Sequence, residues 1–197
     1  MPKEPRHGWQ TKKSTLKYRN AWISVREDAV VYPDGRPGIY GVLDKGPGVC
    51  VLPQAEDGGI YMIRQYRYTI DAEVWELPAG AIGDGESETA AARRELREET
   101  GLAARRFRRL GDFYTALGHE TAKIIVYLAA GLKPHAGRGL RQPDETILEI
   151  AKFSPAGLRR MIREDRIKCG ITLAALNHLF QARSRVPLRS PDRQQRR

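Results

Sequence analysis

The sequence of 197 residues lacks the features of membrane-spanning and disulfide-stabilised proteins. Its longest uninterrupted apolar run, 124–130, is far shorter than the roughly 18 residues that a membrane-spanning helix needs. No apolar stretch follows the basic N-terminus, so we expect no secretory signal. The chain has only two cysteines and no CxxC spacing, and Cys50, inside the apolar run GVCVLP, is expected to be a buried structural thiol. We therefore expect a soluble protein of the reducing cytoplasm.

Acidic residues are scarce at the two ends of the chain. The formal net charge is +10, but residues 1–17 hold five Lys or Arg and one acid, and residues 181–197 hold six Arg and one acid. The body between them is nearly neutral. Charged ends are usually solvated, so we predict a basic flexible N-terminal tail (1–17) and a basic disordered C-terminal tail (183–197). The terminal arginines are not interleaved with aromatic residues, so nucleic acid is not an expected partner.

The order of apolar and turn-forming segments predicts an α/β (α+β) protein. Short β-branched and aromatic runs separated by turn residues indicate strands over the first 80 residues. The segment SETAAARRELREET is dense in helix formers, with Ser87 as N-cap and Gly101 just past its end. A second helix begins at Ser154 and Pro155. The expected strands are 21–32, 39–43, 48–52, 60–66, 107–114, 123–130 and 147–153, the expected helices are 88–100, 155–163 and 172–182, and 133–146 is an expected loop.

Three glutamates of the first predicted helix, Glu95, Glu98 and Glu99, are spaced i, i+3, i+4 and therefore share one helix face. Like charges placed so closely repel one another unless cations neutralise them. One interpretation is a solvated face paired with the arginines of the same helix. The other is a site for a hard divalent cation, Mg²⁺ or Mn²⁺, which prefers carboxylate oxygens. The three residues alone leave both interpretations open.

The segment from Gly80 to Leu102, GAIGDGESETAAARRELREETGL, resembles the signature of the Nudix hydrolases. That signature is a glycine, five residues, a glutamate, seven residues, then Arg-Glu-apolar-x-Glu-Glu-x-Gly-apolar. Its positions are filled here by Gly80, Glu86, Arg94, Glu95, Leu96, Glu98, Glu99, Gly101 and Leu102. We expect Glu86 to pair with Arg94, the two glycines to permit tight turns, and Leu96 to anchor the inner side.

The resemblance implies a Nudix-type α/β/α sandwich around a mixed sheet over residues 46–182. It also implies an N-terminal antiparallel β extension over residues 18–45, acting as a dimerisation layer. The implied activity is Mg²⁺-dependent hydrolysis of the pyrophosphate bond of a nucleoside diphosphate linked to another moiety. By the same resemblance, Arg94 is structural and Glu98 and Glu99 are catalytic. The implied metal ligands are Glu95, Glu98, Glu99 and the backbone carbonyl of Ala79.

The flanking segments RQYR (64–67), VWELPAG (74–80) and IKCGITLAAL (167–176) resemble the ADP-ribose pyrophosphatase and nucleoside-diphosphate-sugar hydrolase branch. This implies cleavage of ADP-ribose to AMP and ribose 5-phosphate in a homodimer, with GDP-mannose or another sugar nucleotide as the alternative. Arg67 is expected to contact pyrophosphate or ribose, and Arg64 is either a second contact or an exposed strand-end charge. Tyr18 and Trp22 either stack on the base in the partner's site or pack within their strand.

The chain departs from this branch after the signature. The branch carries a Pro-Gly turn and, four residues after that glycine, a glutamate that acts as base or metal ligand. Here Leu117 replaces the proline, Ala122 stands at the glutamate position, and Glu120 comes two residues early. The candidates for the general base are therefore Glu120, Glu98, His119, Asp144 and Glu145.

Two other functions are left open by these features. Ala122 is compatible with a weakly active Nudix-fold nucleotide-binding or regulatory module, although a silent module has no need of a costly acidic cluster. The basic tails are compatible with attachment to capped or diphosphorylated RNA ends. Hydrolysis of a small sugar nucleotide is the function that the signature favours.

Overall fold

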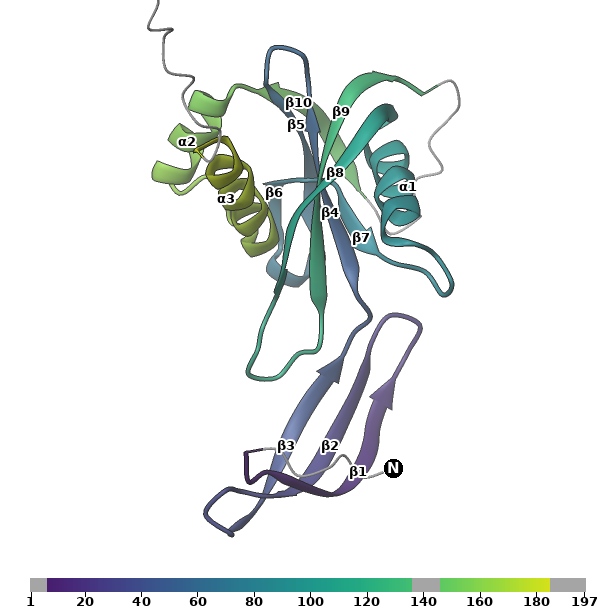
Figure 1. Cartoon of the computed structure of the whole chain (residues 1–197), viewed down its shortest axis with the longest axis vertical. Helices are drawn as coiled ribbons and strands as arrows, with labels where there is room; N and C mark the ends of the chain where they lie inside the picture. Colours follow the sequence, from purple (N-terminus) through teal and green to yellow (C-terminus); the bar gives the residue numbers. More distant parts are fainter. Residues whose placement is uncertain (1–6, 136–145, 185–197) are drawn as a thin grey trace, which may run out of the picture.

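The computed structural model describes residues 7–135 and 146–184. These residues form a three-stranded N-terminal sheet and a larger seven-stranded sheet (Figure 1). One face of the larger sheet carries α1 (Glu88–Thr100), and the other carries α2 (Pro155–Arg163) and α3 (Gly170–Ser184). The predicted α/β/α sandwich with an N-terminal antiparallel extension is thus confirmed.

The N-terminal sheet is an antiparallel meander of β1 (Gln10–Arg19), β2 (Ser24–Val31) and β3 (Pro37–Asp44). It projects from one end of the larger domain (Figure 1). The prediction of a flexible tail over 1–17 is wrong from Gln10 onward, and residues 1–6 lie outside the described part. Backbone pairing with β2 makes β1 a strand, while its many charged side chains stay exposed to solvent.

The larger sheet has the strand order β10-β5-β4-β9-β8, and two short strands, β6 and β7, pair with β5 and β4. The β4 and β9 strands run parallel, whereas the other pairs are antiparallel. Neither β6 nor β7 was predicted from the sequence, because VWELPAG reads as one apolar segment interrupted by proline. The strands are β4 (Gly48–Gln54), β5 (Ile60–Arg67), β6 (Ala72–Glu76), β7 (Ala79–Ala81), β8 (Leu102–Tyr114), β9 (Lys123–Pro134) and β10 (Ile147–Phe153).

Strand β4 separates the two hydrophobic cores. Val49 and Val51 face α1 and pack with Leu96, whereas Cys50 and Leu52 face α2 and α3. This alternation follows from the period of two in a strand that is covered on both faces. Cys50 is completely buried, as predicted, and burial raises the pKa of its thiol well above the usual value.

The predicted helix ends are present in the structure. The Ser87 hydroxyl accepts a hydrogen bond from the Ala90 amide at 3.2 Å, and Gly101 ends α1 with a left-handed φ of 67°. At the start of α2, Ser154 accepts from the Gly157 amide at 3.0 Å. None of the helices in the described ranges has the length and apolar character needed to cross a membrane. Beyond Ser184, the predicted C-terminal tail lies outside the described residues.

Candidate active site

The acidic face of α1 lies against β7 and its following loop. The side chains of Glu95 and Glu99 are each only 2% exposed, and the Ala79 amide donates a hydrogen bond to Glu99 Oε2 at 3.2 Å. A Cβ atom on Gly80 would lie 2.1 Å from Glu95 Oε1. The Glu95 carboxylate therefore occupies the space that a side chain at position 80 would need.

This contact corrects the role expected for the first glycine of the signature. Gly80 lies inside strand β7 and is not among the glycines with positive φ. It is needed for the close approach of the Glu95 carboxylate, and a tight turn is not the reason. Gly101, by contrast, has the left-handed conformation that the sequence predicted.

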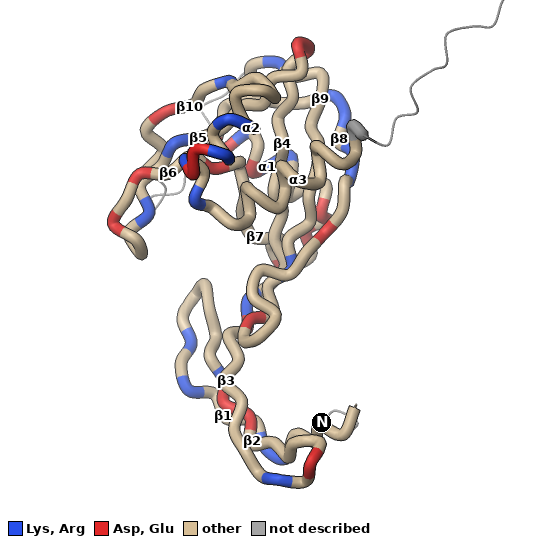
Figure 2. Tube along the Cα trace, turned by 90° about the vertical axis from the view of Figure 1, so that its left-hand side faces the viewer, with Lys and Arg blue, Asp and Glu red and all other residues tan. Residues whose placement is uncertain are grey.

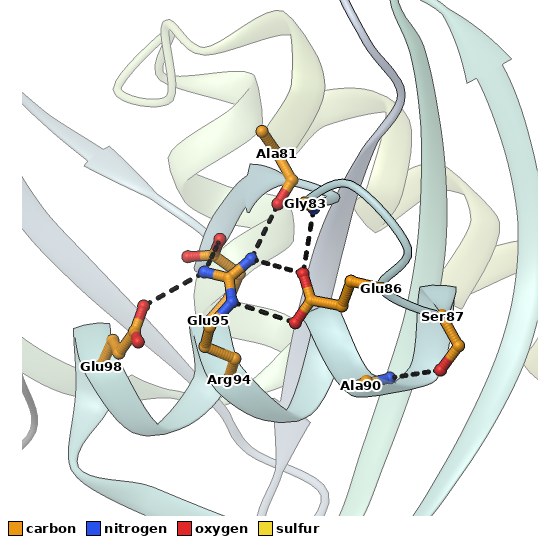
Figure 3. A network of polar contacts seen from close by, with 8 residues as sticks. All are labelled: Ala81, Gly83, Glu86, Ser87, Ala90, Arg94, Glu95 and Glu98. Atoms are coloured by element: carbon orange, nitrogen blue, oxygen red, sulfur yellow. Dashed lines mark hydrogen bonds and ion pairs between the residues drawn. The ribbon is translucent and has the colours of Figure 1, made fainter.

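The guanidinium group of Arg94 is the centre of the polar network (Figure 3). Its Nε and Nη2 donate to the two carboxylate oxygens of Glu86 at 3.1 and 3.0 Å, which is the pairing expected from the sequence. Nη2 also donates to the Ala81 carbonyl at 2.8 Å. On the other side, Nη1 contacts Glu95 Oε1 at 2.6 Å and Glu98 Oε2 at 3.1 Å. One cation thus joins the loop before α1 to two carboxylates on the helix.

The same contacts set the ionisation of the network. Hydrogen bonds from Arg94, together with one from the Gly83 amide at 3.0 Å, hold the pKa of Glu86 below its ordinary value. The pKa of Arg94 is raised, chiefly by its hydrogen bonds to Glu86 and further by Glu95 and Glu98. Both effects favour the charged forms, so the ion pair persists at neutral pH.

The donor set suits a hard divalent cation. Hard oxygen ligands are available from the carboxylates of Glu95, Glu98 and Glu99 and from the carbonyl of Ala79. Because Gly80 has no side chain, there is room for the Glu95 carboxylate beside β7. Over the part of the chain that the structure describes, no three His, Cys, Asp or Glu side chains converge into a ready-made metal cluster. Arg94 accounts for this at Glu95 and Glu98, because its guanidinium already holds both carboxylates.

An open cavity of about 610 Å³ adjoins this network. Glu98, with a side chain 20% exposed, presents its carboxylate there beside Arg94. Glu120 is not among the lining residues. The cavity is lined by Ala81, Gly83, Asp84, Gly85, Glu86, Arg94, Glu95 and Glu98.

The two predicted arginine contacts on β5 are already paired. Arg67 is exposed, with 45% of its side chain accessible, and donates to Glu76 Oε2 at 2.8 Å. Arg64 forms surface ion pairs with Glu73 at 2.5 Å and Glu149 at 2.9 Å. Both guanidinium groups are thus oriented by acids.

Sequence reasoning assigned no role to Glu76, although it orients Arg67. Its carboxylate is buried and also accepts from Gln65 Nε2 at 2.7 Å. The signal was present in the sequence as the only acid inside the apolar segment VWELPAG.

The aromatic candidates of the N-terminal sheet are exposed. Trp22, in the turn between β1 and β2, is 71% exposed and Tyr18 is 54% exposed. This turn lies at the end of the sheet that faces the larger domain (Figure 1). Of the two interpretations offered for these residues, packing within the strand does not describe such exposed rings.

The loop 115–122 holds the remaining candidates. Glu120 forms an ion pair with Lys45 at 3.4 Å, His119 is exposed, and Ala122 is buried. Asp144 and Glu145, the later acids considered as bases, lie outside the described residues.

The sandwich and its acid-lined α1 define a hydrolase fold of the Nudix type, and comparison with known proteins agrees. Residues 44–168 match the NUDIX domain family, so the chain belongs to the Nudix hydrolase family. Residues 9–43 match the nucleoside diphosphate sugar hydrolase N-terminal domain, which coincides closely with β1 to β3.

Several curated relatives share most of their length with this chain. It is 32% identical over 171 residues to an ADP-ribose pyrophosphatase of Mycobacterium tuberculosis, which covers 86% of this chain and 82% of that protein. It is 32% identical to an ADP-ribose pyrophosphatase of Bacillus subtilis (80% and 84% covered). It is 29% identical to a GDP-mannose pyrophosphatase of Enterobacter sp. strain 638 (70% and 75% covered). A crystal structure of an ADP compounds hydrolase superimposes with a TM-score of 0.80 at 19% identity, covering 92% and 97% of the two chains.

The close approach at Gly80 predicts the effect of adding one methyl group. Gly80→Ala forces the Glu95 carboxylate or β7 to move, and we expect a loss of about 1–3 kcal/mol in the free energy of unfolding, measured by urea denaturation. Gly46→Ala is the matched control, because nothing lies within 4 Å of its added Cβ. Equal stability of the two variants would contradict the contact.

The lowered pKa of Glu86 predicts a pH-dependent contribution to stability. Because the folded state lowers this pKa, the stabilisation is present above the ordinary value of 4.5 and is lost as the pH falls through the folded-state pKa. We expect Glu86→Gln to lower the free energy of unfolding at pH 7 and to approach wild type as the pH falls further below 4.5. Urea denaturation with a chelator present measures this, with the exposed Glu56→Gln as control. A deficit that does not change with pH would refute the assignment.

Proposed function

We propose that this chain hydrolyses the pyrophosphate bond of ADP-ribose to AMP and ribose 5-phosphate with Mg²⁺ as cofactor. The observation that carries the proposal is the set of carboxylates on α1, two of them buried against β7, next to an open cavity. The N-terminal domain match and the names of the relatives support a sugar nucleotide as substrate.

In this proposal, Glu95, Glu98, Glu99 and the Ala79 carbonyl hold the cation. A bound divalent cation offsets the negative charge of a pyrophosphate and makes an attacking water more acidic. Arg94 is a positioning residue: it fixes the loop before α1 and bridges the carboxylates of Glu95 and Glu98.

Substrate contacts are assigned to Arg67 and Trp22. The Arg67 guanidinium, oriented by Glu76, presents its remaining N–H groups to pyrophosphate or ribose oxygens. The exposed Trp22 ring stacks on the base in the site of a second copy. Arg64 has two acid partners, so we assign it a supporting contact at the edge of the site.

The general base is assigned to Glu120, with Glu98 as the alternative. Glu120 is the acid nearest in sequence to the position where the branch carries its glutamate. Glu98 is favoured by position, because it lines the cavity that Glu120 does not. In either case a carboxylate takes the proton released by the attacking water.

A GDP-mannose or other sugar-nucleotide substrate is the second candidate. The relative named GDP-mannose pyrophosphatase supports it. The buried acidic cluster argues against a silent regulatory module, because such a cluster costs stability without a bound cation.

A second copy of the chain is the proposed partner of the N-terminal sheet. Among residues 7–135 and 146–184, no helix covers this sheet (Figure 1), and a small sheet needs a packed hydrophobic face to be stable by itself in water. Large apolar side chains are exposed on both faces, including Leu16 at 53% and Ile39 at 66%. Lys and Arg are interspersed with Asp and Glu on the sheet (Figure 2), so opposite charges are available for pairing between copies.

Turnover assays test the activity. With Mg²⁺ and ADP-ribose, GDP-mannose, UDP-glucose, NADH, dinucleoside polyphosphates and capped RNA as substrates, we expect the highest kcat/KM on ADP-ribose. Glu99→Gln removes a ligand charge and should lower kcat by about 100-fold or more, whereas the exposed Glu164→Gln should not. Failure to hydrolyse all six substrates, or full activity of Glu99→Gln, would overturn the proposal.

Sedimentation experiments test the second copy. We expect the wild-type protein to have twice the mass of one chain, and Ile39→Asp to dissociate it, because a charge is costly in an apolar interface. Leu148→Asp, at an exposed apolar position of β10, is the matched control and should stay dimeric. A monomeric wild type would contradict the partner assignment.

A further inference from the structure

The loop 115–122 reaches from the ends of β8 and β9 to the N-terminal sheet (Figure 1). Its tip is open to solvent, since Leu117 is 81% exposed. Such a tip has little apolar contact to order it. What holds the loop is instead a set of polar contacts with the segment 40–45, at the end of β3 and just after it.

Backbone pairing joins the two segments. The Leu43 amide donates to the His119 carbonyl at 2.8 Å, and the Thr121 amide donates to the Leu43 carbonyl at 3.1 Å. This forms a parallel bridge between Leu43 and Glu120. The parallel arrangement of β4 and β9 therefore extends to the end of β3 and the loop 115–122.

Side chains reinforce this pairing on both sides. The Thr121 hydroxyl accepts from the Lys45 amide at 3.0 Å and donates to the Lys45 carbonyl at 3.1 Å. The Tyr40 hydroxyl donates to the Gly118 carbonyl at 2.5 Å. Lys45 Nζ lies 3.4 Å from Glu120 Oε1, and the Glu120 side chain is only 12% exposed. A carboxylate in a solvent-exposed loop is thus largely covered and paired with one cation.

We propose that the segment 40–45 positions Glu120 for the hydrolytic reaction, with Lys45 as the residue that orients its carboxylate. This inference rests on the proposed function and deepens it. The branch pattern has a proline turn in this loop, and here Leu117 replaces it. Hydrogen bonds from the end of the N-terminal sheet hold this loop. Glu120 lies two residues before the position where the branch carries its glutamate, and the parallel bridge to Leu43 holds its backbone.

A kinetic comparison tests this role. Lys45→Met removes the ion pair and should lower kcat about 10-fold with KM changed less than about 2-fold, because a misplaced reacting group affects the chemical step more than binding. Lys45→Arg should restore most of the loss. Lys152→Met, which removes an exposed ion pair with Asp57, is the matched control and should leave kcat unchanged.

Combination with Glu120→Gln separates positioning from a merely structural role. If Lys45 acts through the carboxylate, Lys45→Met causes no further loss of kcat in the Glu120→Gln protein. Losses that multiply would overturn the positioning role. So would an active wild type whose kcat does not change in Glu120→Gln.

A second readout does not depend on turnover. Thr121→Val removes both hydroxyl bonds to Lys45, and we expect faster hydrogen exchange at the amides of Leu43 and Thr121, with β4 unchanged. Unchanged exchange at these amides would overturn the proposal that the segment holds the loop. A wild-type protein that hydrolyses none of the substrates would refute the proposed function. Hydrogen exchange in the Thr121→Val protein would still show whether the segment 40–45 holds the loop 115–122.

Discussion

Three carboxylates and a backbone carbonyl surround the guanidinium group of Arg94, and the geometry of the site depends on this one cation. Glu95 and Glu98 lie on one face of α1, where their charges repel each other. The guanidinium bridges them and, through Glu86 and the Ala81 carbonyl, fastens the preceding loop to the helix. Without it Glu95 and Glu98 would lose the group that bridges them, and the loop between β7 and α1 would lose its hydrogen bonds to the helix.

The same cation competes with any metal for two of the proposed ligands. A divalent ion has to share Glu95 and Glu98 with Arg94, or release them from it. Glu99 accepts a hydrogen bond from the Ala79 amide on β7. By bridging Glu95 and Glu98, Arg94 offsets part of the repulsion between these two carboxylates.

Local sequence signals predicted the parts of the fold that depend on neighbouring residues. The ends of α1 followed from Ser87 and Gly101, and the burial of Cys50 followed from its apolar run. The Glu86–Arg94 pair followed from the signature. Strand β1 was missed because its side chains carry no apolar alternation, and only pairing with β2 makes it a strand. The role of Gly80 was missed for a similar reason, since the Glu95 carboxylate reaches it from another element.

The contacts of Glu120 could not be predicted because they join segments 76 residues apart, as between Lys45 and Thr121. Periodicity and spacing report on one element at a time, whereas this pairing depends on how the N-terminal sheet is placed beside the loop. The extension therefore has two consequences for the site. Its end fixes the loop that carries a candidate base, and its exposed apolar surface offers a place for a second copy. A partner bound to this sheet would then limit the motion of the same loop, because both are attached to β3.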